Sequence, residues 1–365
     1  MPDLLRVFAL FGIVVVNVHF LAFPFADVLG QGSVRFSVDG ITVWLVSGLA
    51  GYKSYGLFSF MFGVGLGLLM RSAERRGLAF GKLYRRRMLG LILLGLLHGV
   101  LFFPADILVT YGLWGFALFF MRNWPVRRLI GGGLVFLVLP IVVASSLIFA
   151  YGAAPDYPEL LAFEIAAMSD GAWIDVVIFR AIMFVFVGMI VLFIQGISAL
   201  GWFLLGYAAV KSGVLSDPGA KVWSLGRRWA LSPGVALSLL ASWAVTYHDA
   251  LWGDALLLAA APLATFGYLG LIAKASHAPA PWLSRLLTAG GASLTIYLGQ
   301  SIVLSTLFAP YGAGLWNDLG ATAVTVIAIS VTVALFVFVL LWRRRFSQGP
   351  FEWLLRWFTY RTQRP

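Results

Sequence analysis

Residues 53–115 read KSYGLFSFMFGVGLGLLMRSAERRGLAFGKLYRRRMLGLILLGLLHGVLFFPADILVTYGLWG. Three long apolar runs in this stretch are separated by an arginine-rich segment and by a short break at Pro104. The runs are long enough for helices that cross a bilayer. A titratable group inside hydrocarbon costs a few kcal/mol, roughly, so His98 and Asp106 need a local or functional reason to be there.

The composition of the whole chain indicates a membrane protein. Of 365 residues, 61% are hydrophobic and 11% are charged, whereas soluble domains contain about 25% charged residues. Apolar runs of roughly 20 residues predict an all-α, polytopic helical bundle, and the short alternating segments of an outer-membrane barrel are absent. The chain has no cysteine, which excludes disulfides and thiolate chemistry. The net charge of +11 sits in short loops, so we expect no nucleic-acid partner.

We predict a single transmembrane domain over 1–365 with about ten spans, or eleven if one long run divides. Residues 41–52 are apolar and predict a short re-entrant or interfacial helix before the second span. Residues 176–210 are too long for one upright helix, and we expect a bend near Gln195–Gly196. The ten expected spans are 4–23, 55–70, 88–103, 107–121, 129–151, 176–210, 229–248, 252–273, 287–308 and 320–342.

Arginine and lysine residues predict the orientation, because short cytoplasmic loops carry an excess of them. Loops 71–87, 122–128 and 211–228 are basic, and so is the tail that begins at Arg343. All four face the cytoplasm if 176–210 crosses once. Both termini are then cytoplasmic, 343–365 forms a basic amphipathic cytoplasmic tail, and the acidic loop 152–175 lies outside.

His98 and Asp106 form the strongest candidate pair. Pro104 ends one span and the chain turns back at once, so we expect the two side chains to approach each other toward the outer side. A carboxylate beside an imidazole fixes its tautomer and raises its basicity, as a general base requires. A purely structural hydrogen-bonded pair is the alternative. Tyr111 lies about one turn beyond Asp106 and is expected in the same cavity.

Arg6 and Asn17 lie eleven positions apart on the first span, which brings them to nearly one face of a helix, about 16 Å apart along its axis. This polar stripe should face the interior of the bundle. Arg6 as a snorkelling interfacial residue and Asn17 as an interhelical hydrogen-bond donor are the alternatives. His19 points to a different face and is interpreted as an interfacial residue that joins Asn17 only if the helix unwinds.

Three further polar residues are candidates for substrate binding. Lys53 and Ser59 flank the start of the second span, where Lys53 has snorkelling as its alternative role. Arg180 lies within an apolar run and is a candidate anion-binding residue, unless it pairs with Asp175. No metal motif, Walker A loop, G-x-S-x-G or dinucleotide fingerprint occurs, so we expect no metal.

Six collinear segments resemble motifs of the DUF418 family of bacterial membrane proteins. They cover nearly the whole chain: LLRVFALFGIVVVNV at 4–18, residues 53–67, LGLLHGVLFFPADILVTYGLWG at 94–115, GWFLLGYAAVKSGVL at 201–215, GGASLTIYLGQSI at 290–302 and GPFEWLLRWFTY at 349–360. Val7, Gly291 and Ile296 depart from the family pattern, which has glycine, arginine and asparagine there. The resemblance implies a bacterial inner-membrane protein grouped with transmembrane acyltransferases.

Such enzymes move an acyl group from cytoplasmic acyl-CoA to a hydroxyl or amine acceptor, often a sugar or envelope glycan, across the bilayer. The resemblance therefore implies an acyl-CoA-dependent acyltransferase, with acetyl-CoA as the expected donor. Arg85, Arg86 and Arg87 would hold the phosphates of CoA, although they could equally be orientation signals. The pantetheine arm would follow Arg6 and Asn17, and a homodimer is left open.

In this reading His98, oriented by Asp106, deprotonates the acceptor, and Asn17 donates to the oxyanion. Both direct transfer and a transient acyl-histidine are compatible with the sequence. Two other functions remain open. One is a transporter or lipid-handling protein with His98, Asp106 and Arg180 along its pathway. The other is a structural assembly partner.

Overall fold

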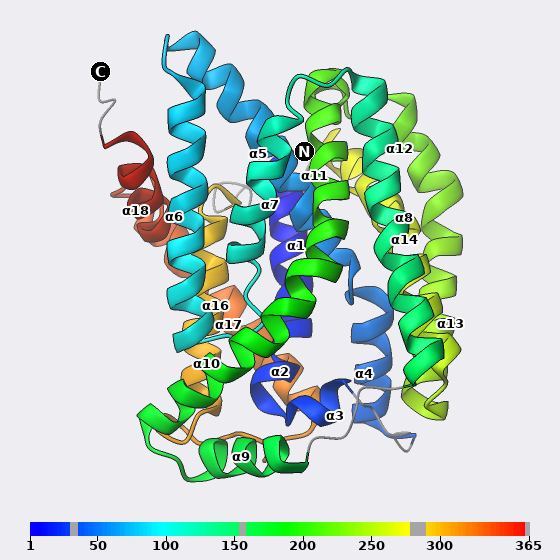
Figure 1. Cartoon of the computed structure of the whole chain (residues 1–365), viewed down its shortest axis with the longest axis vertical. Coiled ribbons are helices and arrows are strands. Elements are labelled where there is room, and N and C mark those ends of the chain that lie inside the picture. The colour runs from blue at the N-terminus through cyan, green and yellow to red at the C-terminus, as the bar shows by residue number, and fades with distance from the viewer. Residues whose placement is uncertain (30–35, 153–157, 278–289, 362–365) are drawn as a thin grey trace.

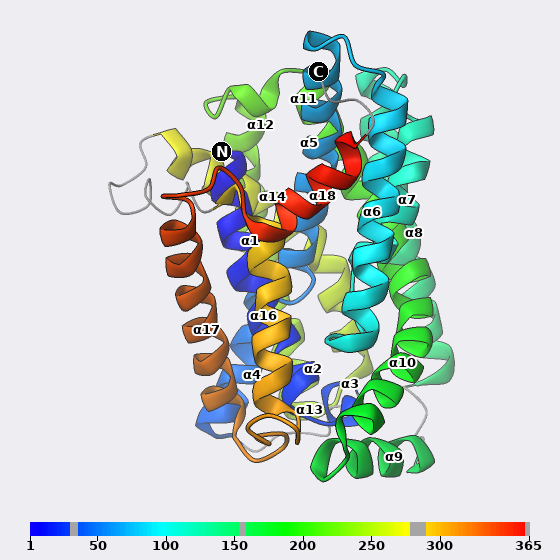
Figure 2. The same cartoon turned by 90° about the vertical axis from the view of Figure 1, so that its left-hand side faces the viewer.

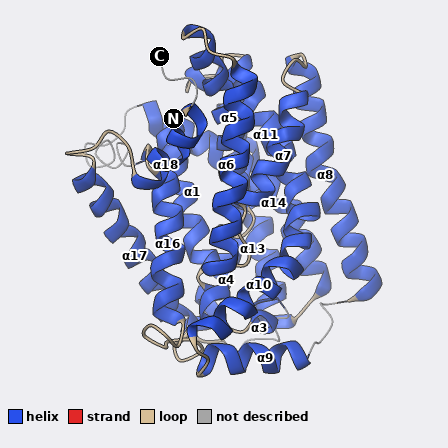
Figure 3. Ribbon diagram, turned by 60° about the vertical axis from the view of Figure 1, so that its left-hand side comes forward, coloured by secondary structure: helices blue, strands red, loops and turns tan. Residues whose placement is uncertain are grey.

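The computed structural model describes residues 1–29, 36–152, 158–277 and 290–361, and these ranges contain helices and no strand (Figures 1 and 3). The all-α prediction is therefore confirmed for the described chain. Its longer elements are α1 (Pro2–Asn17), α4 (Val38–Leu49), α5 (Lys53–Arg75), α6 (Phe80–Leu101), α7 (Leu108–Phe120), α8 (Val126–Tyr151), α9 (Pro158–Ser169), α10 (Trp173–Ile190), α11 (Gly196–Lys211), α13 (Leu231–His248), α14 (Leu251–His277), α16 (Ser293–Phe308), α17 (Ala321–Trp342) and α18 (Pro350–Tyr360).

Shorter helical pieces extend or link these elements. The first span continues from α1 through Val18 into α2 as one apolar segment, Pro2–Ala22. The short pieces are α2 (His19–Ala22), α3 (Phe25–Leu29), η1 (Val191–Gln195), η2 (Val214–Ser216), α12 (Lys221–Leu225) and η3 (Gly226–Ala230).

The second apolar segment, Val38–Arg75, is broken in its middle. α4 ends at Leu49 and α5 begins at Lys53, with Tyr52 held at a positive φ of 58° between them. A side chain with a Cβ rarely adopts this conformation, so the break is a defined feature of the fold. The expected short helix over 41–52 corresponds to α4, which is joined directly to the second span.

The long segment Trp173–Lys211 is one continuous helical path with a local change of winding. α10 passes into η1, a π-helical turn over Val191–Gln195, and then into α11. π-turns are a common cause of helix bends. The bend expected at Gln195–Gly196 falls at the end of this turn, and the structure does not divide the segment into two separate crossings.

Among the described residues, seven helical segments are long and apolar enough to cross a membrane. α7 and α16 are apolar but shorter. The count of about ten spans stays a prediction, and the expected span 287–308 begins outside the described residues. The seven segments are Pro2–Ala22, Val38–Arg75, Val126–Tyr151, Trp173–Lys211, Lys221–His248, Leu251–His277 and Ala321–Trp342.

α1 begins and α18 ends toward the same end of the bundle, the end that carries the α5–α6 connection and α12 (Figure 2). We call this the arginine-rich end, because it carries Arg75, Arg76 and the arginines that follow α17. The opposite end carries α2, α3 and α9 (Figure 1). We call it the α9 end. α18 lies across the bundle beside α6 and α16 (Figure 2), and residues 362–365 of the predicted basic tail lie outside the described residues.

Small residues bring α5 and α11 into direct contact. A Cβ on Gly63 would collide with the backbone of Phe203, and one on Gly206 would collide with the backbone of Phe60. A Cβ on Gly67 would meet the side chain of Val210. The Gly63–Gly67 pair therefore allows close packing between two helices of the same chain, as G-x-x-x-G patterns do in membranes.

Candidate functional site

His98 and Asp106 lie in contact where α6 ends and α7 begins. The Nδ1 atom of His98 is 2.8 Å from Oδ1 of Asp106, and both residues are 3% exposed. The predicted approach of the two residues is confirmed. α6 ends at Leu101 and α7 starts at Leu108, so the short connector through Pro104 brings the carboxylate back to the last turn of α6.

Asp106 is held by the backbone of the helix that follows it. Its Oδ2 atom accepts hydrogen bonds from the amides of Leu108 at 2.7 Å and Val109 at 3.3 Å. These amides begin α7 and have no partner within the helix, so the carboxylate caps them. Gly95 on α6 provides the space, because a Cβ there would lie 2.7 Å from Oδ2 of Asp106.

Tyr297 on α16 completes the cluster. Its hydroxyl donates to Oδ1 of Asp106 over 3.2 Å, and its ring centroid is 5.3 Å from that of His98. This residue was missed by the sequence analysis, since it lies far from Asp106 along the chain. It does belong to GGASLTIYLGQSI, one of the segments that resembled the family, and that segment was the signal available.

The arrangement leaves one ring nitrogen of His98 available. An ionised carboxylate only accepts hydrogen bonds, so a carboxylate at Asp106 favours the tautomer of His98 that has its proton on Nδ1. The other nitrogen, Nε2, is buried and has no hydrogen-bond partner in the described part of the chain. An unprotonated imidazole nitrogen oriented by a carboxylate can accept a proton or act as a nucleophile.

A cavity of about 430 Å³ runs inward between α1, α5, α6, α7, α16 and α18. Its mouth is basic: four arginine side chains line it, with Glu352 as the acidic residue among them. Arg87 lies within electrostatic range of Arg6 and Glu352. The four arginines are Arg6, Arg76, Arg87 and Arg356.

The inner part of the cavity is aromatic and reaches the neighbourhood of the His98–Asp106 pair. Phe58, Leu108 and Tyr111 line it, and the hydroxyl of Tyr111 lies 2.7 Å from that of Ser59. The ring of Phe58 is 6.2 Å from that of Tyr111 and 6.0 Å from that of Tyr297. One layer of aromatic rings therefore separates the cavity from Tyr297, which contacts Asp106.

Comparisons with known proteins identify the family. The model for "Protein of unknown function (DUF418)" matches residues 209–362. Over 390 residues, the chain is 30% identical to uncharacterized protein YxaH of Bacillus subtilis, covering 100% of this chain and 94% of YxaH. The chain belongs to the DUF418 family. It is also 29% identical to uncharacterized protein YeiB of Escherichia coli, over 100% of this chain and 96% of YeiB. No solved structure matches the chain.

The arginines proposed to bind CoA do not all lie at the cavity of this DUF418 protein. Arg6 and Arg87 line the mouth, and Arg6 forms an ion pair with Asp3 at 2.6 Å. Arg85 is exposed and donates to the carbonyl oxygen of Gly81, and neither Arg85 nor Arg86 lines the cavity.

Arg76 and Arg356, which the sequence analysis did not single out, complete the mouth of the DUF418 cavity. Arg356 arrives on α18, whose start is fixed by Glu352. The carboxylate of Glu352 accepts from the amide of Leu294 at 2.6 Å and from the hydroxyl of Thr295 at 2.5 Å. These contacts tie α18 to the first turn of α16.

Asn17 and His19 do not join this site. Asn17 does not line the cavity and makes no side-chain hydrogen bond to a described residue, so no contact connects it to His98. His19 is buried, and its Nε2 lies 3.2 Å from the hydroxyl of Thr325 on α17. The helix stays wound through Val18, so His19 packs within the core and away from Asn17's face.

Lys53 and Arg180 are buried at other positions in the bundle. Lys53 is fully buried, and its ammonium donates to the carbonyl oxygen of Ser47 at 3.2 Å. Arg180 is 2% exposed and donates to the carbonyl of Leu101 and the hydroxyl of Tyr311, at 2.8 and 2.9 Å. Its alternative partner, Asp175, instead caps the start of α10 by accepting from the amide of Ala172.

Arg180 therefore holds α10 against the end of α6, close to the turn that carries the His98–Asp106 pair. Neither Lys53 nor Arg180 lines the 430 Å³ cavity. Within the described residues, no group of three or more His, Cys, Asp or Glu side chains is placed to hold a metal ion.

Proposed function

We propose that the protein is a membrane acyltransferase that takes an acyl group, with acetyl as the expected case, from cytoplasmic acyl-CoA. One observation carries the proposal. A cavity with four arginines at its mouth reaches inward to the aromatic rings that pack on Tyr297. Tyr297 in turn packs on a buried histidine, His98, whose Nε2 has no described partner. A polyanionic donor with a long thin arm fits such a shape, because its phosphates pair with arginines and its arm enters the apolar part.

The orientation of the bundle supports this direction of entry. The cavity mouth lies at the arginine-rich end, which the positive-inside rule assigns to the cytoplasm. Acyl-CoA is made in the cytoplasm, so donor and mouth would be on the same side. The protein would then lie in the bacterial cytoplasmic membrane with both termini inside the cell.

The proposed chemistry follows from the two ring nitrogens of His98, of which Nδ1 faces Asp106 and Nε2 is available for the reaction. Nε2 of His98 removes the proton from an acceptor hydroxyl or amine, whose oxygen or nitrogen forms a bond to the thioester carbon. The tetrahedral oxyanion then collapses, the carbon–sulfur bond breaks, and the CoA thiolate takes up the proton. Asp106 stabilises the imidazolium that forms in between, as a carboxylate partner of histidine does.

The oxyanion would need a hydrogen-bond donor. We assign this to the hydroxyl pair of Tyr111 and Ser59, since Tyr111 lines the inner cavity, while Asn17 has no contact with it. Movement of the Phe58 ring would bring the thioester to His98. The acceptor is expected to be a sugar or envelope glycan at the outer side, as the resemblance to transmembrane acyltransferases implied.

The test uses purified protein in detergent with acetyl-CoA. We expect saturable CoA binding by calorimetry and slow release of free CoA, by transfer of the acetyl group to water. His98→Gln should abolish the release and retain the binding, because residue 98 does not line the mouth. Absence of CoA binding would contradict the proposal, and undiminished release by His98→Gln would remove the histidine from the mechanism.

A transporter or lipid-handling function is the second candidate. The helix break at Tyr52 and the π-helical turn at Val191–Gln195 favour it, since transporters bind substrates at discontinuous helices near the middle of the bilayer. It predicts no acyl transfer and impaired transport by the His98→Gln variant, because His98 would line the pathway.

A further inference from the structure

Four interrupted helices meet on the side of α5 that faces α8 and α14. Tyr52 at positive φ precedes α5, and a π-helical turn ends at Gln195. Pro140 lies inside α8 and Pro262 inside α14. Irregular backbone within a membrane bundle is tolerated where it is buried in protein or lines a cavity. These four residues line one small pocket.

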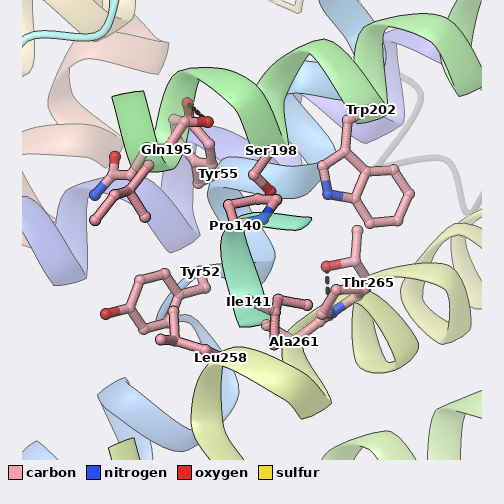
Figure 4. A pocket seen from close by; sticks show the side chains of 12 residues that line it. Tyr52, Tyr55, Pro140, Ile141, Gln195, Ser198, Trp202, Leu258, Ala261 and Thr265 are labelled. Atoms are coloured by element: carbon pink, nitrogen blue, oxygen red, sulfur yellow. Dashed lines mark hydrogen bonds between the residues drawn. The ribbon is translucent and has the colours of Figure 1, made fainter. Parts of the chain in front are cut away.

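The pocket has a volume of about 50 Å³ and shares no lining residue with the large basic cavity. Figure 4 shows Ser198 and Trp202 on α11 facing Ile141 and Ala261 across it. A volume several times that of one water-sized probe, about 10–15 Å³, holds a small polar group with a few carbon atoms. No Asp, Glu, Lys, Arg or His side chain lines the pocket, so its occupant is uncharged.

Several hydrogen-bonding groups on the pocket wall have no partner in the described chain. The hydroxyl of Ser198 and the indole N–H of Trp202 make no hydrogen bond to a described residue. The carbonyl of Leu258, which also lines the pocket, lacks its usual helical donor because Pro262 has no N–H. The wall thus offers both donors and an acceptor to one small group.

Apolar side chains that flank the pocket-lining residues along the chain are exposed on the surface of the bundle. On α8, Val138 and Val142 flank Pro140–Ile141 and are each 56% exposed. On the other side, Ile190 and Phe193 of the α10–η1 segment are 47% and 53% exposed. These side chains belong to segments apolar enough to cross a membrane, so they are placed to face the hydrocarbon of a bilayer.

We propose that this pocket binds the hydroxyl end of a long-chain, uncharged lipid alcohol that enters from the bilayer between α8 and η1. A hydroxyl both donates and accepts, which matches the Leu258 carbonyl on one side and Trp202 and Ser198 on the other. The pocket lies in the middle of its four helices, at a depth where phospholipid headgroups do not reach. The chain of the alcohol lies along the exposed apolar side chains of α8.

The test is photo-crosslinking of the purified full chain with a long-chain alcohol that carries a diazirine on its third carbon. We expect label on the peptides that contain Trp202 and Thr265, both nearly fully buried at the pocket wall. Unlabelled hexadecanol should compete, and hexadecyl methyl ether, which cannot donate, should not. Equal competition by the ether, or label confined to exposed side chains such as Phe193, would overturn the proposal.

Two variants and a matched control sharpen the result. Ser198→Phe fills the pocket and should reduce the specific label at least ten-fold, whereas Val185→Phe adds the same ring to the exposed surface of α10 and should leave it unchanged. If Ser198→Phe does not fold, Trp202→Phe removes one donor and should lower the label about five-fold, the effect of one hydrogen bond. Wild-type labelling of Trp202→Phe would contradict the assigned contact. None of these readouts depends on acyl transfer.

Discussion

Tyr297 and His98 share one acceptor: Oδ1 of Asp106 receives the phenol hydroxyl at 3.2 Å and faces the imidazole Nδ1 at 2.8 Å. Two helices, α6 and α16, therefore meet at a single carboxylate oxygen. The other oxygen of Asp106 is occupied by the backbone amides of α7. This geometry makes Asp106 the residue that fixes the orientation of the histidine ring.

Asp106→Asn should lower the rate of CoA release by roughly 100-fold or more, in the range that general-base catalysis contributes. The amide presents a donor to His98 and disturbs the tautomer in which Nε2 is free. Tyr297→Phe should lower the rate by less and shift the pH dependence of the rate, because the phenol acts only through Asp106. A Tyr297→Phe enzyme with an unchanged pH profile would show that Tyr297 has a structural role only.

The arginines at the cavity mouth should determine the affinity for CoA. Arg87→Gln or Arg356→Gln is expected to weaken CoA binding about ten-fold each, because each removes a charged hydrogen-bond donor to phosphate. Arg85→Gln is the matched control, since Arg85 lies on the same helix and does not line the cavity. Calorimetry at two salt concentrations measures the effect. Equal losses at Arg85 and Arg87 would mean that nonspecific charge, and not the cavity, binds the ligand.

Gly63 should be sensitive to the smallest substitution. Gly63→Ala places a methyl group against the backbone of Phe203, and we expect a loss of roughly 1–3 kcal/mol in the free energy of unfolding. Gly65→Ala, two positions away on the same helix, meets no atom within 4 Å and should be neutral. Thermal unfolding in detergent compares the two variants, and a similar effect of both would contradict the close α5–α11 packing.

Glu164 on α9 should make the fold sensitive to pH. Burial raises the pKa of this carboxyl from 4.5 to about 7, although its hydrogen bonds from the amide of Phe25 oppose the shift. Between pH 4.5 and 7 the folded protein then binds more protons than the unfolded chain, so stability falls as the pH rises. Below pH 4.5 both states are protonated, and above 7 the penalty is constant.

The melting temperature measured across this pH range should decrease for the wild type and much less for Glu164→Gln, which keeps an acceptor for Phe25 without the ionisable group. A wild-type melting temperature that rises steadily from pH 4.5 to 7 would contradict this assignment. Glu159, on the same helix, has an exposed side chain, so Glu159→Gln serves as the control.

The orientation in the membrane can be tested by single cysteines, because the chain contains none. Asp318 and Ser347 are exposed residues at the two ends of α17: Asp318 precedes the helix and Ser347 follows it. In intact spheroplasts, a membrane-impermeant maleimide should label Asp318→Cys, and it should label Ser347→Cys only after permeabilisation. The reverse pattern would place the arginine-rich end outside the cell and contradict acyl-CoA entry through the basic cavity.

Local features were predictable from the sequence, and contacts between distant segments were not. Pro104 and the short connector were sufficient to bring Asp106 to His98, and the length of 176–210 was sufficient to predict the bend that the π-helical turn produces. The contact of Tyr297 depends on how α16 packs against α6, which hydropathy does not encode. Every expected span is apolar, so the hydropathy pattern does not specify which helices are neighbours.

The same limit applies to the positions of the arginines. Arg85, Arg86 and Arg87 are consecutive, but successive residues of a helix point about 100° apart, and of the three only Arg87 lines the cavity. Arg356 reaches the mouth because Glu352 fixes α18 on α16, a tertiary contact. The burial of His19 likewise depends on α17.

The cavity mouth combines Arg6 of α1 with Arg356 of α18, two residues near opposite ends of the sequence. During synthesis, the helices from α1 to α17 leave the ribosome before α18 does. A nascent chain that lacks α18 therefore has no complete arginine-lined mouth, even when its earlier helices are already in the bilayer. Acyl-CoA would be excluded from productive binding until translation has passed Arg356, so immature chains in the membrane would not consume it.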